Sequence, residues 1–225
     1  MIRTRDEGPI RVVTLDRPNR RNALTRDGLD ALARAVDTTD AAVVYLEGAG
    51  TAFCAGADLD VLRSLDGDDA AAFADRGQRT MNAIETADAV VVAGIDGPAR
   101  GGGVELALAA DVRVATPDAT FAEPGVSLGV FGAWGGTRRL LEAVGETHAT
   151  DLSYSGRTVD ASEALAMGLV SRIVDDPYTV AVEIAANDPA ALRELKGLLA
   201  APRPHREQER HEREAFERLL EDGLE

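Results

Sequence analysis

Continuous runs of β-branched and other apolar residues alternate with amphipathic stretches along the first half of the chain. The apolar runs predict buried strands at residues 10–15, 42–46, 89–95 and 111–115. Between the first two runs, apolar residues recur at Leu29, Leu32, Ala33 and Val36, which predicts a helix with Thr25 as its N-cap. Strands that alternate with helices favour an α/β sheet as the fold class.

Helical patterns occupy most of the remaining sequence. They cover an acidic region at 58–87 and further segments at 104–110, 135–144, 148–154, 162–167 and most of 180–200. The charged segment 204–220 carries apolar residues near its end and predicts an amphipathic helix, packed on the body or on another subunit. We expect an α/β core at residues 1–174 and a C-terminal helical region at residues 175–225, without a linker that separates independent domains.

Three consecutive glycines mark the first candidate site. The strand at 89–95 leads to Gly101, Gly102 and Gly103, and a helix follows at once. Glycine costs roughly 1 kcal/mol relative to alanine inside a helix, so this run suggests close approach of a ligand to free N–H groups at the positive helix end. Glu105 lies about one turn after Gly102, which places an acid/base group beside a site for a developing negative oxygen. A Gly-rich turn with a surface glutamate explains the spacing equally well.

A second loop has similar character. Residues 52–59 (AFCAGADL) are small and lead into a helical segment, so N–H groups around Ala57 can point at a ligand. Taken alone, this loop is better explained by tight packing of small residues.

Several blocks together resemble the crotonase superfamily, the enoyl-CoA hydratases and isomerases. The main ones are LDRPNRRNAL (15–24), AFCAGADL (52–59) and GIDGPARGGGVELALAAD (94–111). Further matches are FAEPGVSLG (121–129), GGTRRL (135–140), GRTVDASEALAMGLVSRIV (156–174) and DPAALRELK (188–196). The blocks cover nearly all of the chain in the family's order, and jointly they are specific.

The resemblance implies a crotonase-like spiral core of ββα units with C-terminal helices that build trimers or pairs of trimers. It also implies a coenzyme A thioester as substrate and no separate cofactor. Ala57 and Gly102 match the two oxyanion-hole residues of the family, and Glu105 matches the first of its two catalytic glutamates. The positions that resemble the substrate-binding part of the family are Asn22, Ala23, Ala55, Asp58 and Leu59.

The chain departs from the hydratase pattern at Gly125, where hydratases carry their second catalytic glutamate. Glu123 is the candidate substitute, but Pro124 between them leaves the direction of its side chain open, and a structural or surface role explains Glu123 better. Trp134 also differs from many members; it either lines the acyl pocket or is a core aromatic.

These departures leave three interpretations. The first is an enoyl-CoA hydratase-like enzyme that uses Glu105, with Glu123 as its second catalytic residue. The second keeps the oxyanion hole but performs isomerisation, hydrolysis, decarboxylation or C–C cleavage, reactions that need fewer groups than hydration. The third is a catalytically silent CoA-binding subunit.

Charge and cysteine content narrow the partners and the compartment. The net charge of −15 argues against nucleic acid and anionic membranes as partners. No apolar run is long enough to span a bilayer, the N-terminus lacks the pattern of a secretion signal, and the single Cys54 cannot form an internal disulfide. We therefore expect a cytoplasmic protein that uses no membrane as a partner.

The remaining reactive residues suggest little further chemistry. The three histidines, His148, His205 and His211, are too far apart to predict a metal site, and Cys54 is best explained as a small buried residue. Three arginines either oppose the phosphates of CoA or form ion pairs on the surface: Arg20, Arg21 and Arg100.

Overall fold

The computed structural model describes residues 1–200 and 203–221 and is built around a six-stranded sheet in the order β1-β2-β3-β4-β6-β9. Its strands are β1 (Ile2–Glu7), β2 (Ile10–Leu15), β3 (Val43–Gly48), β4 (Val90–Ile95), β6 (Val112–Ala115) and β9 (Arg172–Ile173). β1 pairs antiparallel with β2, and the other neighbours are parallel. The four predicted strands are confirmed within one or two residues at each end.

The sequence pattern missed five short or polar strands. β1 lies at the sheet edge with nearly all its side chains exposed, so its sequence lacks an apolar run. A separate three-stranded sheet contains β5 (Pro98–Arg100), β7 (Thr120–Ala122) and β8 (Val159–Asp160). These strands and β9 have only two or three residues, which is too few for a periodic signal. β5 thus lies in the segment between the predicted strand at 89–95 and the three glycines, where no strand was predicted.

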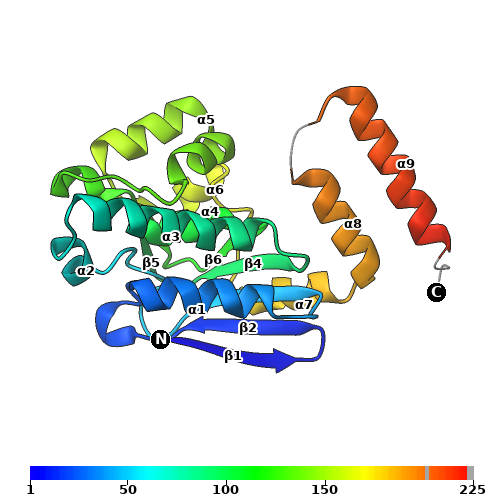
Figure 1. Ribbon diagram of the computed structural model, residues 1–225, viewed down its shortest axis with the longest axis horizontal. Coiled ribbons are helices and arrows are strands. Elements are labelled where there is room, and N and C mark those ends of the chain that lie inside the picture. The colour runs from blue at the N-terminus through cyan, green and yellow to red at the C-terminus, as the bar shows by residue number, and fades with distance from the viewer. Residues whose placement is uncertain (201–202, 222–225) are drawn as a thin grey trace.

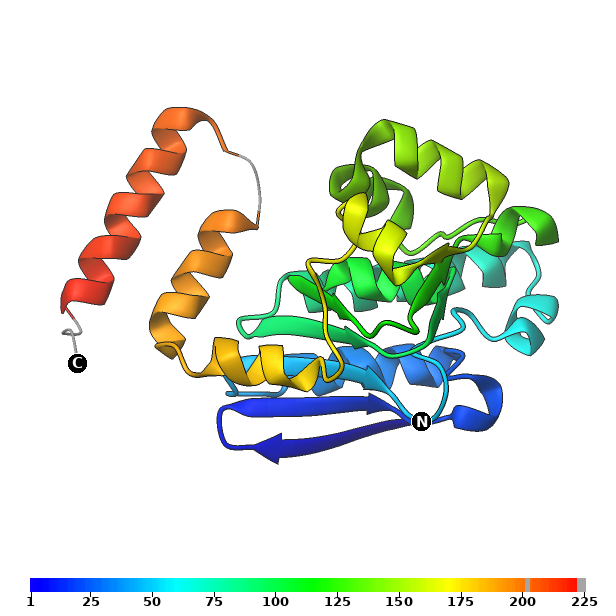
Figure 2. The same ribbon diagram turned by 180° about the vertical axis from the view of Figure 1, so that it is seen from behind.

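Helices cover both faces of the large sheet (Figures 1 and 2). One face packs in the larger hydrophobic core with α1 (Arg26–Asp37), α3 (Gly67–Glu85) and α4 (Gly102–Ala109). The other face packs against α7 (Tyr178–Ala185) through Val180 and Ala181. The remaining helices are α2 (Leu59–Arg63), α5 (Gly136–Ser155), α6 (Ala161–Ala166), α8 (Pro189–Leu199), α9 (His205–Glu221) and the 3-10 helices η1 (Pro18–Arg20) and η2 (Pro124–Leu128).

Local signals explain how individual helices begin and bend. Thr25 caps α1 as predicted, because its hydroxyl accepts the N–H of Gly28 at 3.2 Å. The two helices predicted at 135–144 and 148–154 are one element, α5, with a kink at Gly145, where φ is 74° and ψ is 168°. The backbone conformation of Gly145 marks the interruption that the periodicity indicated.

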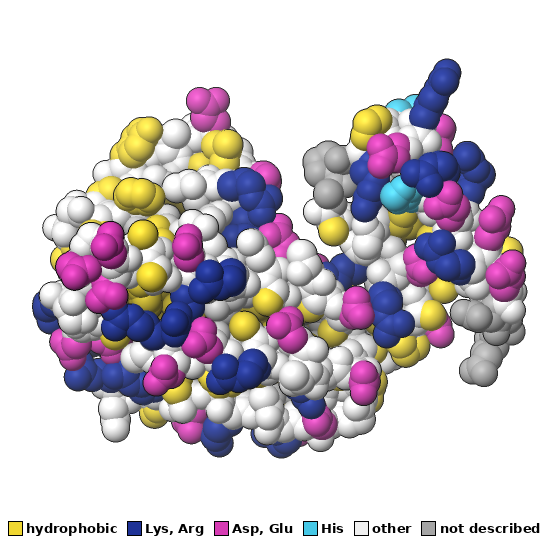
Figure 3. Space-filling view, viewed as in Figure 1, with side chains coloured by type: hydrophobic (Ala, Val, Ile, Leu, Met, Phe, Trp, Pro, Cys, Tyr) yellow, Lys and Arg dark blue, Asp and Glu magenta, His cyan; other side chains and the backbone are white. Residues whose placement is uncertain are grey.

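α8 and α9 lie side by side and extend away from the sheet (Figures 1 and 2). Arg218 of α9 pairs with Glu194 of α8 at 2.8 Å, so the segment predicted at 204–220 packs on the chain's own preceding helix. The Nζ of Lys196 joins α8 to the core by donating to Ala89 O and Asp111 Oδ2, each at 2.8 Å. Figure 3 shows acidic and basic side chains interspersed over one face of the molecule.

The expected boundary at residue 174 follows directly after β9. The first helix beyond it, α7, nevertheless shares the hydrophobic core of the sheet. The division into a core and a C-terminal helical region therefore remains a proposal. Residues 201–202 and 222–225 of that region lie outside the described residues.

Candidate active site

The two candidate loops lie directly against each other at the start of α4. The N–H of Cys54 donates to Pro98 O at 3.2 Å, and the N–H of Arg100 donates to Cys54 O at 2.9 Å. A Cβ on Gly56, whose φ is +84°, would lie 2.8 Å from Gly102 N and 2.5 Å from Arg100 O. The backbones therefore touch, and only glycine permits that contact at position 56.

This contact leaves two backbone donors beside one pocket. Ala57 and Gly102 both line a cavity of about 470 Å³. One amide next to each of them is occupied, since Asp58 N donates to Leu24 O and Gly101 N donates to Ala122 O, each at 2.9 Å. Within residues 1–200 and 203–221, the N–H groups of Ala57 and Gly102 donate to no other residue. Gly102 also begins α4, so the positive end of that helix faces the same site.

Glu105 lies one turn into α4 and lines the same cavity. Only 1% of its surface is exposed, and its Oε1 accepts the N–H groups of Trp134 and Gly136, each at 2.8 Å. Burial raises the pKa of this carboxyl, and the two N–H bonds oppose that rise by stabilising the ionised form. No described residue binds its Oε2, which leaves that oxygen for a ligand.

The loop at residues 132–136 forms a cradle for the Glu105 carboxyl. A Cβ on Gly132 would lie 2.8 Å from Glu105 Cδ, and one on Gly136 would lie 2.7 Å from its Oε1. Arg139 holds this loop, because its guanidinium donates to Trp134 O at 3.0 Å and pairs with Glu85 of α3 at 2.6 Å. Sequence reasoning assigned no role to Arg139 or to the two glycines, although they belong to or flank the GGTRRL block.

Glu123 is a second carboxyl in the cavity. It lies between β7 and η2 and is only partly exposed. Burial, and next the nearby charge of Glu105, raise the pKa of Glu123 to about 8. Gly125 also lines the cavity, and a Cβ there would lie 2.9 Å from Val130 O. The structure thus places Glu123 beside Glu105, a direction that the sequence left open.

The rest of the cavity wall is mainly apolar. It includes Leu59, Leu62, Leu65, Ala70, Phe73, Ala74, Leu128, Val130, Phe131 and Trp134. Trp134 is 3% exposed and packs edge-on against Phe73, with ring centroids 5.7 Å apart. Its ring also covers Gly102, where a Cβ would lie 2.3 Å from it. Trp134 is therefore a core aromatic and part of the wall at once.

The candidate CoA-binding residues divide into two groups. Ala55 and Leu59 line the cavity. Asn22, Ala23 and Asp58 are buried outside its lining. The Asn22 Nδ2 donates to Ala49 O and Ala52 O, and Asp58 caps α2 while it pairs with Arg17 at 2.5 Å. The side chains of Asn22 and Asp58 thus shape the loops that carry Ala55, Ala57 and Leu59.

Other candidate groups contribute no chemistry to this cavity. Burial raises the pKa of Cys54 to about 12, so its thiol stays protonated. Among the described residues, no group of three or more His, Cys, Asp or Glu side chains is arranged to hold a metal ion. Arg100 donates to Thr120 O at 2.8 Å and to its Oγ1 at 2.9 Å, and Arg20 pairs with Asp60 at 2.9 Å. No helix in the described part of the chain combines the length and apolarity that crossing a membrane requires.

Comparisons with known proteins identify the family of the chain. The family described as enoyl-CoA hydratase/isomerase matches residues 5–222. The short-chain-enoyl-CoA hydratase of Clostridium acetobutylicum is 33% identical over 198 residues, which cover 83% of this chain and 76% of that protein. The crotonyl-CoA hydratase of Syntrophomonas wolfei is 36% identical over 173 residues, covering 75% of this chain and 66% of that protein.

Solved structures give the same answer for the fold. The crystal structure of enoyl-CoA hydratase from Thermoplasma volcanium superposes with a TM-score of 0.92 at 30% identity, covering 99% of this chain and 93% of that one. The crotonase-like fold expected from the motifs is confirmed. The chain belongs to the enoyl-CoA hydratase/isomerase family of enzymes, within the crotonase superfamily.

Proposed function

We propose that the protein catalyses hydration of a 2-enoyl-CoA, with the thioester oxygen held by the N–H groups of Ala57 and Gly102. The observation that carries this proposal is that both unpaired N–H groups line one cavity with Glu105 and Glu123. Charge moves onto the thioester oxygen as the enolate forms, and one such donor is worth about 3 kcal/mol in the transition state. CoA itself passes the segments around Asn22–Ala23 and Asp58–Leu59, with Ala55 beside the thioester.

The two carboxyls take different roles in this proposal. Burial raises the pKa of Glu105, but the two N–H bonds that it accepts favour its ionised form, so we assign it as the base that removes a proton from water. Glu123 is protonated at neutral pH, because its pKa is about 8, and it delivers a proton to Cα. The water oxygen bonds to Cβ, and the electrons of the double bond form the new Cα–H bond by way of the enolate. Product analysis tests the reaction, since hydration adds one water, whereas isomerisation leaves the mass unchanged and hydrolysis releases CoA.

We expect the rate of hydration to fall as the pH rises through about 8. The raised pKa keeps Glu123 protonated below this pH, and the acid is lost above it. The check is a kcat profile between pH 6 and 9.5 for the wild type and Glu123→Gln. The variant should lose at least ten-fold in kcat at pH 7 and show no fall near pH 8. An identical alkaline fall in both proteins would remove Glu123 from the reaction.

We also expect a strong preference for acyl groups without charge. The cavity wall is mainly apolar, so a charged tail would lose its hydration there, and the ionised Glu105 carboxylate would repel an acidic substituent. An enoyl-CoA with an alkyl tail should have a kcat/KM about 10²-fold above that of an isosteric substrate whose tail ends in a carboxylate. Equal values for the two substrates would contradict the assignment of this cavity to the acyl group.

We further propose that the chain assembles as a homotrimer or a pair of trimers. Large apolar side chains stay exposed on the α8–α9 pair: Leu195, Leu199, Phe216 and Leu220. Packing them against other copies would remove this surface from water.

A further inference from the structure

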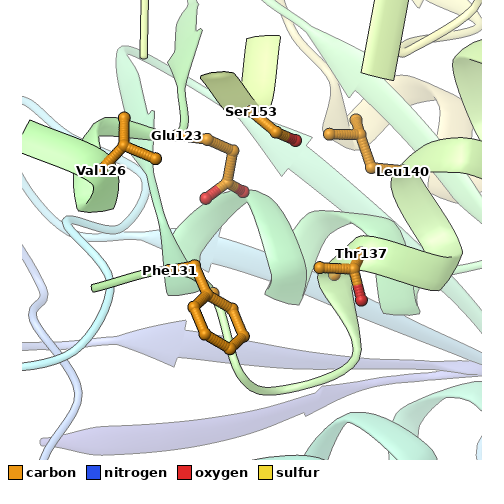
Figure 4. Close-up of a pocket in the computed structure, with 8 residues that line it drawn as sticks. Glu123, Val126, Phe131, Thr137, Leu140 and Ser153 are labelled. Carbon is orange, nitrogen blue, oxygen red and sulfur yellow. The ribbon is translucent and has the colours of Figure 1, made fainter. Parts of the chain in front are cut away.

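A second, smaller cavity lies next to the acyl cavity and shares Glu123, Phe131 and Gly132 with it. Its volume is about 40 Å³, and we call it the side chamber. The rest of its lining is Val126, Gly136, Thr137, Leu140 and Ser153. Figure 4 shows the Glu123 carboxylate among the side chains of Val126, Phe131, Thr137, Leu140 and Ser153. One carboxyl therefore has access to both cavities.

Thr137 and Ser153 of α5 line the side chamber, and their hydroxyls have no partner among the described residues. Serine and threonine in a helix commonly donate to the carbonyl four residues earlier. Thr150 and Ser155 of α5 do so, at 2.8 Å and 2.7 Å. Ser153 and Thr137 form no hydrogen bond through their hydroxyls within residues 1–200 and 203–221. Both groups are therefore available to whatever occupies the chamber.

Water is the occupant that suits the size and chemistry of the side chamber. A cavity needs roughly 10–15 Å³ of accessible volume to hold one water molecule, and the water needs two to four polar partners. The chamber has about 40 Å³ and offers the Glu123 carboxyl with the hydroxyls of Ser153 and Thr137. Thr137 is exposed and Ser153 is partly exposed. The side chamber is therefore connected to solvent beside these two residues of α5.

We propose that the side chamber is a proton-supply route to Glu123, in which Ser153 and Thr137 position the water that reprotonates this carboxyl. The proposal rests on the proposed function, in which Glu123 loses its proton to Cα in each turnover. A chamber water then gives a proton to the Glu123 carboxylate and recovers one from solvent. Glu105 releases the proton that it took from the attacking water, so the cycle consumes one water. Product can still fill the acyl cavity during this step, because Thr137 and Ser153 line the chamber and do not line the acyl cavity.

The surroundings of Glu123 fix the direction of the effect. Glu105 of α4 is the one charged group, among those the structure describes, that acts on the Glu123 carboxyl. α5 presents the two hydroxyls and Leu140, η2 presents Val126, and the following loop presents Phe131. Removal of the hydroxyls withdraws the groups that position the chamber water, and this water stabilises the ionised carboxylate by donating to it. The pKa of Glu123 should therefore rise when they are lost.

The test is a double variant, Thr137→Val with Ser153→Ala, studied by infrared titration of the protonated Glu123 carboxyl. The Glu123→Gln difference spectrum identifies the band. We expect its midpoint to rise by about one pH unit, and kcat at pH 7 to fall about ten-fold with KM changed less than two-fold. Thr147→Val with Ser155→Ala is the matched control, on the same helix but outside the chamber, and should leave the midpoint in place. Ser153→Thr with Thr137→Ser keeps both hydroxyls and should retain most of the wild-type kcat.

Two results overturn the proposal: an unchanged infrared midpoint in the double variant, or the same loss of kcat in the control pair. If the double variant does not fold, the infrared midpoint and kcat are measured in Thr137→Val and Ser153→Ala separately, and the same two results overturn the proposal. The infrared midpoint requires no turnover. If the double variant shows the shift but the wild type hydrates no enoyl-CoA, the proposed function is contradicted while the chamber's link to Glu123 stands.

Discussion

Replacement of Glu105 by glutamine is expected to lower kcat for hydration by about 10³-fold without unfolding the protein. General acid–base catalysis contributes 10²–10⁴-fold, and Glu105 is the proposed base. Glutamine keeps a carbonyl oxygen that can accept the N–H groups of Trp134 and Gly136, but it cannot take a proton from water. The measurement is steady-state hydration of crotonyl-CoA and a longer alkyl enoyl-CoA, combined with thermal unfolding.

The matched control for this variant is Glu142→Gln. Glu142 is exposed on α5 and pairs with Arg138 at 2.8 Å, so its loss removes a surface charge of the same sign. Its kcat should stay within two-fold of the wild type. Turnover that is unaffected in Glu105→Gln would exclude Glu105 from the mechanism.

Replacement of Gly56 by alanine should separate the two N–H donors without touching any side chain in the cavity. The new Cβ would meet Gly102 N at 2.8 Å and Arg100 O at 2.5 Å, so the loops at 52–58 and 97–103 must move apart. Removal of one oxyanion donor costs 10²–10³-fold in kcat, and we expect about 10²-fold here. The free energy of unfolding should fall by about 2–4 kcal/mol, from backbone strain and overpacking together.

Gly8→Ala is the control that separates the effect of backbone strain at a positive φ from the effect of moving the two loops apart. Gly8 also has a positive φ, +58°, but a Cβ there meets nothing within 4 Å, so only the backbone cost of about 1–2 kcal/mol applies. Its kcat should equal that of the wild type. Gly56→Ala could lose stability by the expected amount of about 2–4 kcal/mol and still retain full kcat. In that case the pairing of Ala57 and Gly102 as oxyanion donors would be wrong.

The secondary structure was predictable wherever burial left a pattern in the sequence. The β2, β3 and β4 strands are buried on both faces or nearly so, and their apolar runs identify them. Every residue of α4 is buried, so all its residues except Glu105 are apolar or glycine, and only Glu105 stands out. β1 pairs only with β2, and nearly all its side chains are exposed. Its sequence therefore contains no apolar run from which the strand could be predicted.

The candidate site was partly predictable for a similar reason. Gly102 and Glu105 lie on one helix turn, so their proximity follows from local geometry. Ala57 comes from a loop more than forty residues earlier, and its contact with Gly102 depends on how β3 and β4 bring the two loops together. Spacing cannot report such a contact, which is why the family resemblance, not the spacing, linked the two residues.

By itself, the sequence determined the α/β class and the membership in the crotonase superfamily, and it named Glu105 as a candidate acid/base group, because each is recorded in local spacing or in ordered motifs. The tertiary structure alone decided where Glu123 points, how Arg139 and the 132–136 loop hold Glu105, and that Ser153 and Thr137 share a chamber with Glu123. Those relations join residues that are distant in the chain or follow a proline. Packing sets their directions, and no periodicity records it.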